Sequence, residues 1–179
     1  YGIDLYGEYS LARLMKELCK IDKMKWLRTL YCYPEAVTDE LIETFRDEEK
    51  IVKYIDMPMQ HISEDILKKM NRQAPKLPLP DLVAKLRAEI PSISIRTTFI
   101  TGFPGETEED FEKLHRFVKE SRFSRMGCFP YSCEEGTPAS KLPDHVDEDV
   151  RVRRAEILTD EQMGIMQEIG ETFIGKTLD

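Results

Sequence analysis

The sequence predicts an α/β protein whose helices alternate with the strands of a largely parallel sheet. Three observations support this fold class. Apolar residues recur at helical spacing in several segments, short runs rich in β-branched and aromatic residues separate these segments, and no long charged linker interrupts them. About four βα units can be traced, too few to close a TIM-like (β/α) barrel. We therefore expect a partial barrel, with further strands before Tyr1 or with its open edges covered by another domain or chain.

The first predicted unit covers residues 11–45. A helix after Ser10 is indicated by apolar residues at positions i, i+3, i+4 and i+7, namely Leu11, Leu14, Met15 and Leu18. Residues 26–33 are rich in aromatic and apolar side chains, which predicts a strand that ends at Pro34. Thr38 can cap the next helix, whose inward-facing residues are then Leu41, Ile42 and Phe45.

The middle of the chain predicts a second and part of a third unit. A short strand is expected around residues 54–57, and Ser63 is placed to begin a helix with apolar residues over 66–70. The proline-rich stretch 73–80 predicts an extended loop. Helical spacing of apolar residues then indicates a helix over 82–90.

The last part of the chain contains the clearest strand, over residues 94–100. Thr107–Asp110 is typical of a capping box, with Asp in place of the usual Glu or Gln, and predicts a helix with an apolar stripe over 111–118. A final strand over 126–129 and a long helix over about 148–170 complete the pattern.

Composition restricts the class of protein. The chain has 34 acidic and 26 basic residues, which gives a net charge of −8. This charge argues against a segment that binds nucleic acid by itself. It is typical of a cytoplasmic enzyme, and it would attract a basic partner protein. No apolar run approaches the roughly 20 residues that a membrane helix needs. The cysteines, Cys19, Cys32, Cys128 and Cys133, are scattered without a Cys-x-x-Cys pair, so we expect reduced thiols rather than a zinc site or disulfides.

Ligands of parallel α/β folds bind in the loops that follow the strands. In the first loop, 31–35, aromatic residues either line a pocket or only close the barrel mouth. In the second, Gln60 offers a donor and an acceptor that suit a ribose hydroxyl, whereas Ser63 also fits a helix cap. His61, a lone histidine, is more often structural.

The third and fourth loops are the richest. Strand alternation places Arg96 and Thr98 on one face, where an inward arginine needs an anion such as a bound carboxylate or a neighbouring acidic residue. Gly102 and Gly105 allow positive φ or a close approach to a ligand, although a simple turn before a capped helix also explains them. The aromatic residues at 129–131 could stack on a flat ring such as adenine.

Taken together these loops resemble those of the radical-SAM methylthiotransferases. The segment 100–107 resembles their Gly-x-Ile-x-Gly-x-x-Glu region, 56–70 their fourth strand and helix, and 131–138 their sixth-strand loop. The resemblance covers nearly the whole chain. It implies about four of the six units of a radical-SAM barrel over residues 1–170, followed at 171–179 by the start of a TRAM-type domain.

Residues 1–7 and 26–34 resemble the branch that modifies a ribosomal protein. The resemblance implies addition of a methylthio group to the β-carbon of an aspartate in the twelfth small-subunit protein. It also implies S-adenosylmethionine and two 4Fe–4S clusters, one of which generates a 5′-deoxyadenosyl radical. The Cys-x-x-x-Cys-x-x-Cys that holds the radical-SAM cluster is absent from this chain, so we expect the metal ligands outside it and no activity from the segment alone.

The resemblance implies cofactor contacts at matching positions, and no catalytic residue within this chain. Arg96 is expected to pair with the methionyl carboxylate, while Gln60 and Ser63 face the ribose or the methionyl end. Thr98 and a loop comprising Gly102, Pro104, Gly105 and Glu106 are expected to flank the sugar. Phe129 and Tyr131 are expected to border the adenine.

Other functions remain open at this stage. One alternative is a MiaB-type enzyme that modifies a tRNA adenosine with the same chemistry, and another is a non-catalytic barrel that docks on the ribosome. A Schiff-base lyase is disfavoured because no lysine lies in the predicted strands. We expect a monomer that contacts no membrane and reaches nucleic acid only through a TRAM-type domain.

Overall fold

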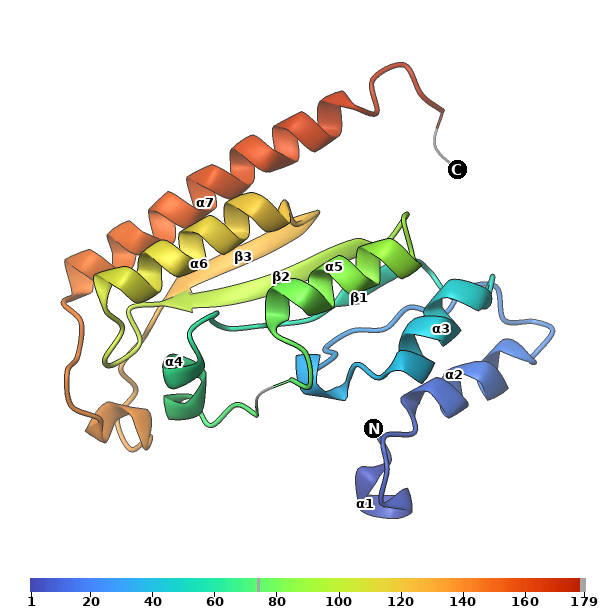
Figure 1. Cartoon of the computed structure of the whole chain (residues 1–179), viewed down its shortest axis with the longest axis horizontal. Helices are drawn as coiled ribbons and strands as arrows, with labels where there is room; N and C mark the ends of the chain where they lie inside the picture. The colour runs from blue at the N-terminus through green and yellow to red at the C-terminus, as the bar shows by residue number, and fades with distance from the viewer. Residues whose placement is uncertain (74, 178–179) are drawn as a thin grey trace. The chain divides into compact units, whose positions relative to one another are not determined.

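The computed structural model describes residues 1–73 and 75–177 (Figure 1). The chain divides into two compact units. The first comprises residues 1–57 and 75–95, and the second comprises residues 58–74 and 96–179. Strand β2 (Ser94–Thr101) begins in the first unit and continues into the second.

Among its described residues, the first unit contains β1, the start of β2 and four α-helices. Its elements are α1 (Ile3–Tyr6), α2 (Leu11–Cys19), the 3-10 turn η1 (Pro34–Ala36), α3 (Asp39–Asp47), β1 (Tyr54–Asp56) and α5 (Leu79–Glu89). Phe45, Ile55 and Leu86 are fully buried in its core. The Ser94 amide donates to the carbonyl of Lys53, which attaches the start of β2 beside β1.

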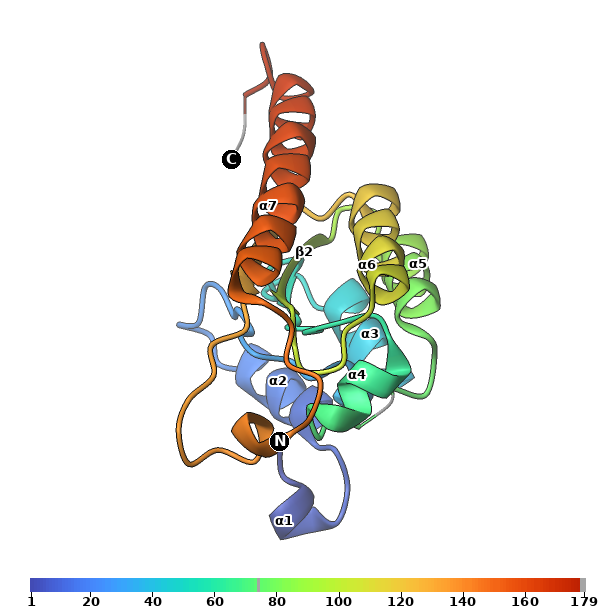
Figure 2. The same cartoon turned by 90° about the vertical axis from the view of Figure 1, so that its left-hand side faces the viewer.

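Among its described residues, the second unit contains two parallel strands and three α-helices. Its elements are α4 (Glu64–Lys69), the main part of β2, α6 (Glu108–Ser121), β3 (Arg125–Pro130), the 3-10 turn η2 (Ala139–Lys141) and α7 (Glu148–Glu171). The helix α7 lies along β3 and beside α6 (Figures 1 and 2). Phe99 of β2 contacts Phe117 and Phe123 in an aromatic cluster, with ring centroids 6.2 and 6.0 Å away.

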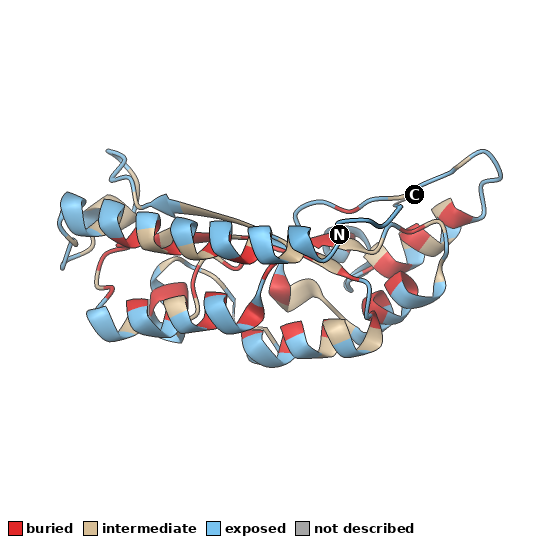
Figure 3. Ribbon diagram, turned by 90° about the horizontal axis from the view of Figure 1, so that it is seen from above, coloured by how far each residue is buried: buried red, intermediate tan, exposed pale blue. Residues whose placement is uncertain are grey.

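The strand order is β1-β2-β3, and β2 and β3 are parallel. The helices carry buried residues on one side and exposed residues on the other (Figure 3). Within the described ranges, no helix is both long and apolar enough to cross a membrane.

Most predicted elements are confirmed. The apolar stripes of α3, α5 and α6 are buried, and the Thr107–Asp110 capping box forms in both directions. The Thr38 hydroxyl caps α3 by accepting from the Leu41 amide at 3.2 Å. The long last helix and the strands at 54–56, 94–101 and 125–130 also lie where the pattern predicts.

The predicted strand over 26–33 is wrong, so the described residues contain three strands rather than four. Only Leu27 forms a bridge, to Ile51, and Tyr31 has φ of +59°, which interrupts an extended chain. Without a regular ladder of backbone hydrogen bonds, β-rich composition does not make a strand.

Two further expectations need correction. The loop over 73–80 ends earlier than predicted, because Leu79 and Pro80 already belong to α5; a proline in the first helical turn sacrifices no hydrogen bond. The buried face of α2 is Ala12, Met15 and Cys19, rotated from the predicted stripe, whose leucines are only half-buried. The predicted start of a TRAM-type domain over 171–179 lies partly outside the described residues and stays a prediction.

Candidate functional site

The open face of β2 and β3 brings three predicted site residues together. Along β2 the residues Ile95, Thr97 and Phe99 are buried, whereas Arg96 is exposed and Thr98 half-buried, as strand alternation predicts. The register pairs Thr98 with Gly127, and Ile100 with Phe129. Paired residues of parallel strands point to the same side, so Phe129 shares this face. Its side chain is 59% exposed.

Gln60 extends this face at the other edge of β2. The backbone amide of Gln60 donates to the Thr98 carbonyl at 2.8 Å, and the backbone carbonyl of Gln60 accepts from the Ile100 amide at 2.9 Å. Gln60 has φ of +69°, a left-handed conformation that costs free energy in a residue with a side chain. The two hydrogen bonds hold it there, beside Thr98.

Ser63 is engaged elsewhere. It occupies the position before α4, but its side chain makes no capping hydrogen bond. Its amide donates to Nδ1 of His61 at 2.9 Å, and its side chain hydrogen-bonds to Asp110 at the start of α6. These contacts connect Ser63 to α6 rather than to Arg96 and Thr98.

The loop after β2 has the backbone geometry that its glycines predict. Gly102 has φ of +70° and Gly105 has φ of +83°. A Cβ at Gly102 would lie 1.9 Å from Cγ of Arg151, so the close packing of α7 on this loop requires glycine. Pro104, between the two glycines, is buried.

Glu106 lies inside the second unit, with its side chain fully buried. Its Oε2 accepts from the Gly102 amide at 2.8 Å, and its Oε1 accepts from Nη1 of Arg154 at 2.7 Å. Nε2 of His61 is 3.3 Å from Oε2, but the angles are not those of a hydrogen bond, and among the described residues this nitrogen has no other hydrogen-bond partner. The carboxylate therefore holds the loop in place from behind.

Tyr131 joins the loop, not the open face. Its amide donates to the Thr101 carbonyl at 2.8 Å, and its ring packs edge-on against Phe103 with centroids 5.0 Å apart. Nη1 of Arg151 donates to the Tyr131 carbonyl. The structure thus separates the predicted aromatic pair, with Phe129 on the strand face and Tyr131 against the loop.

Sequence reasoning missed Arg154, whose role depends on a partner 48 residues away. No local signal marks Arg154, because it is beyond the first turn of α7, which begins at Glu148, and the helix dipole acts on side chains only within that turn. The Arg154 guanidinium also pairs with Glu108 at 2.7 Å. Arg154 therefore connects α7 both to Glu106 in the loop and to the first residue of α6.

Residues 4–118 match the family described as the Radical SAM superfamily. The chain belongs to the Radical SAM superfamily. The match includes Gln60, Arg96 and the loop with Gly102 and Glu106, so most of the site just described lies within it.

Curated relatives extend the similarity over almost the whole chain. The "Ribosomal protein uS12 methylthiotransferase RimO" of Lachnoclostridium phytofermentans is 50% identical over 178 residues, 99% of this chain. The protein of the same name from Clostridioides difficile is 48% identical over 179 residues, 100% of this chain. The chain spans about 40% of the length of these relatives.

Solved structures support the fold. Coproporphyrinogen III oxidase (HemN) from Escherichia coli, a radical SAM enzyme, has a TM-score of 0.62 at 18% identity, covering 88% of this chain and 36% of that one. The radical S-adenosylmethionine methyltransferase TsrM from Kitasatospora setae has a TM-score of 0.54 at 18% identity, covering 69% and 26%. The prediction of a partial radical-SAM (β/α) barrel is thereby confirmed.

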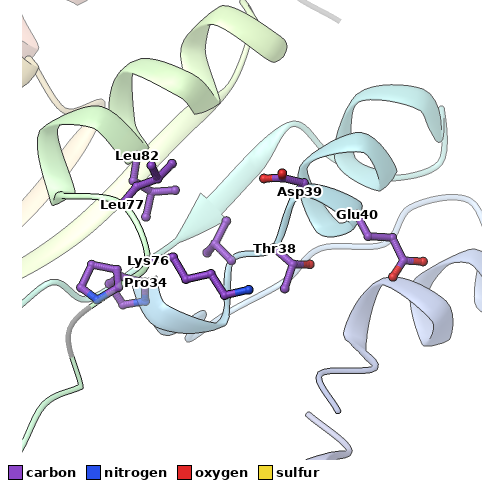
Figure 4. Close-up of a pocket in the computed structure, with 9 residues that line it drawn as sticks. Pro34, Thr38, Asp39, Glu40, Lys76, Leu77 and Leu82 are labelled. Atoms are coloured by element: carbon purple, nitrogen blue, oxygen red, sulfur yellow. The ribbon is translucent and has the colours of Figure 1, made fainter.

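Each of the two units contains a cavity at the end of a predicted element. One, of about 400 Å³, lies in the second unit at the end of β2; it is lined by Gln60, Lys69, Met70, Asn71, Arg72, Ile100, Phe103, Thr137, Pro138 and Ala139. The other, of about 290 Å³, lies in the first unit between the start of α3 and the segment before α5 (Figure 4). The cavity in the first unit is lined by no predicted site residue, whereas the cavity in the second unit is lined by Gln60.

Proposed function

We propose that this chain is part of a radical-SAM methylthiotransferase that acts on ribosomal protein uS12. The reaction adds a methylthio group to the β-carbon of an aspartate of that protein. The observation that carries the proposal is identity of about 50% to RimO proteins over nearly every residue of the chain. The stretch of chain matched by these relatives includes the strand faces and loops of the candidate site as well as the buried core.

The open face fits S-adenosylmethionine. Gly127 stands opposite Thr98 and adds no side chain, which leaves room above the strands. Arg96 is exposed at one end of this face, where its guanidinium can pair with the methionyl carboxylate. Phe129 offers an exposed ring to the adenine, and Gln60 a side-chain amide to the ribose.

When bound and reduced, this cofactor supplies a carbon radical that removes an unactivated hydrogen, which no acid or base in the chain can do. The contribution of the chain is to bind and orient. Glu106 fixes the Gly102 amide, and through it the loop beside β2, before any ligand arrives. A loop held in advance loses less conformational freedom when the cofactor binds.

We place the iron–sulfur ligands outside this chain, because its sequence lacks the Cys-x-x-x-Cys-x-x-Cys motif. Ser63 and Tyr131 stay in the proposed cofactor set, with Ser63 between α4 and the start of α6 and Tyr131 beside the loop. A cytoplasmic monomer, with residues 171–179 beginning a TRAM-type domain that contacts nucleic acid, completes the proposal.

The test uses the full-length protein with reconstituted clusters, S-adenosylmethionine, a reductant and small ribosomal subunits that lack the modification. Mass spectrometry of uS12 should show a gain of one methylthio group at the aspartate, dependent on S-adenosylmethionine. Modification of a tRNA adenosine instead would contradict the assignment and favour a MiaB-type activity. Binding to the subunit with no modification of either substrate would favour the non-catalytic docking role.

A further inference from the structure

The cavity at the end of β2 has a charge that the chain as a whole does not. The protein has eight more acidic than basic residues, yet the charged residues that line this cavity, Lys69 and Arg72, are both cationic. The other lining residues are uncharged, and several are apolar, among them Phe103 and Ile100. An apolar cavity with a basic margin attracts an anionic group carried on a less polar body.

Lys69 is held at this cavity by the shape of the backbone. Its Nζ lies 2.0 Å from the position that a Cβ of residue 105 would take, so the absence of a side chain at Gly105 lets the ammonium approach the loop. Within residues 1–73 and 75–177, Lys69 has no hydrogen bond or ion pair, whereas its neighbour Lys68 is 3.6 Å from Asp65. The Lys69 ammonium is therefore available to a ligand.

A simpler explanation is that basic residues at the end of α4 satisfy the helix dipole. That explanation covers Lys68 and Lys69 equally, because both lie in the last turn. It does not explain why the Lys69 ammonium lies against Gly105, because Arg72, not Lys69, closes the end of the helix: Asn71 turns the chain with φ of +57° and the Arg72 amide donates to the Leu67 carbonyl at 2.9 Å. The turn returns the chain to the cavity wall that Lys69 and Arg72 share.

The cavity adjoins the face proposed for the cofactor. Gln60 belongs to both, and Ile100 follows Thr98 on the same side of β2. Arg96, the residue proposed for the methionyl carboxylate, does not line the cavity. The second unit thus offers separate cationic groups for two carboxylates, and hydrogen abstraction requires that the substrate lie directly beside the cofactor.

We propose that this cavity receives the substrate and that Lys69, with Arg72, binds the carboxylate of the target aspartate. The inference rests on the proposed function, and it adds the residues that select an acidic side chain. Recognition of the carboxylate by an ammonium discriminates against an amide of the same size, because asparagine offers no charge to offset desolvation of the lysine. The cavity would thereby make the enzyme specific for aspartate.

The test measures binding of isolated uS12 to the full-length protein, with either aspartate or asparagine at the target position. The wild type should bind the aspartate form about tenfold more tightly, a typical effect of a hydrogen bond to a charged group. Lys69→Gln and Arg72→Gln should each reduce this preference, while the affinity for S-adenosylmethionine stays unchanged. Lys68→Gln is the matched control, because Lys68 lies on the same helix but does not line the cavity; it should keep the preference.

Each contrary outcome has a defined meaning. If the wild type modifies uS12 but shows no preference for aspartate, or if Lys69→Gln keeps the preference, the inference is wrong while the proposed function stands. If Lys69→Gln weakens binding of S-adenosylmethionine instead, the carboxylate belongs to the cofactor and the inference is also wrong. If the wild type neither binds nor modifies uS12, the proposed function itself fails.

Discussion

Arg154 of α7 and Glu106 of the loop after β2 form a buried ion pair, with Nη1 2.7 Å from Oε1. Their side chains are 8% and 0% exposed, so neither charge is compensated by water. Removing one partner of such a pair leaves the other charge buried alone, which costs about 3–5 kcal/mol. We therefore expect Arg154→Met to lower the free energy of unfolding by about this amount in urea denaturation.

Glu108→Gln is the control for this prediction. Glu108 also pairs with Arg154, at 2.7 Å, but its side chain is 70% exposed. An exposed ion pair contributes less than about 1 kcal/mol, so this variant should resemble the wild type. Equal losses for both variants would contradict the assignment of Glu106 as the buried partner that matters.

Gly102→Ala should destabilise the loop and weaken S-adenosylmethionine binding. An alanine Cβ would lie 1.9 Å from Cγ and 2.7 Å from Cβ of Arg151, at the stem of that side chain, where a rotation cannot remove the clash. With φ of +70° as a second penalty, we expect a loss of about 1–3 kcal/mol. The measurement is a thermal unfolding curve, supplemented by calorimetry with the cofactor.

Gly164→Ala is the matched control for Gly102→Ala, and it should have the opposite effect on stability. Gly164 lies inside α7, and a Cβ there meets no atom within 4 Å. Alanine favours a helix over glycine by roughly 0.5–1 kcal/mol, so this variant should be more stable than the wild type. A loss at position 164 as large as that at 102 would show that the loop geometry is not the cause.

The capping box of α6 should make stability depend on pH. Burial alone raises the pKa of Asp110, but hydrogen bonds from Thr107 and Ser63 outweigh it and hold the pKa below the usual 3.8. A lowered folded-state pKa stabilises the protein above pH 3.8, and this stabilisation is lost as the pH falls through the folded value. Asp110→Ala should therefore lower the free energy of unfolding by about 1 kcal/mol at pH 7. This gap between the wild type and the variant should narrow below pH 3.8.

Urea denaturation at a series of pH values from 7 to 3 measures this gap. Glu109→Ala is the control, because Glu109 lies in the same helical turn but its side chain is 77% exposed and forms an exposed ion pair with Lys113. Its effect should stay within about 0.5 kcal/mol. A gap for Asp110→Ala that does not change with pH would mean that the carboxylate charge plays no part in the cap.

Features determined by neighbours in sequence could be predicted. The cap at Thr107 and the apolar stripe of α6 depend on residues three or four positions apart, and both form as expected. The segment 26–33 has equally suitable composition for a strand, but a strand also requires a continuous hydrogen-bonding partner. The positive φ of Tyr31 and the single bridge at Leu27 show that this partner is missing along most of the segment.

The residues of the candidate site also fall into those that their local sequence predicts and those that depend on distant partners. Strand alternation correctly placed Arg96 and Thr98 on one face, because side-chain direction in a strand follows from position alone. The burial of Glu106 could not be foreseen, since it depends on Arg154, 48 residues later, and on the packing of α7 against the loop. Nor does the sequence by itself reveal that Gly105 admits the ammonium of Lys69.

Arg96→Ala tests the proposed cofactor contact. If the guanidinium pairs with the methionyl carboxylate, its removal should raise the Kd for S-adenosylmethionine at least tenfold, as expected for a charge-assisted hydrogen bond. Calorimetry on the full-length protein with reconstituted clusters gives this value. Arg116→Ala, at an exposed position of α6, changes the net charge equally and should leave the Kd unchanged. Reduced thermal stability without a change in Kd would instead assign Arg96 to an ion pair within the protein, the alternative that the sequence also allows.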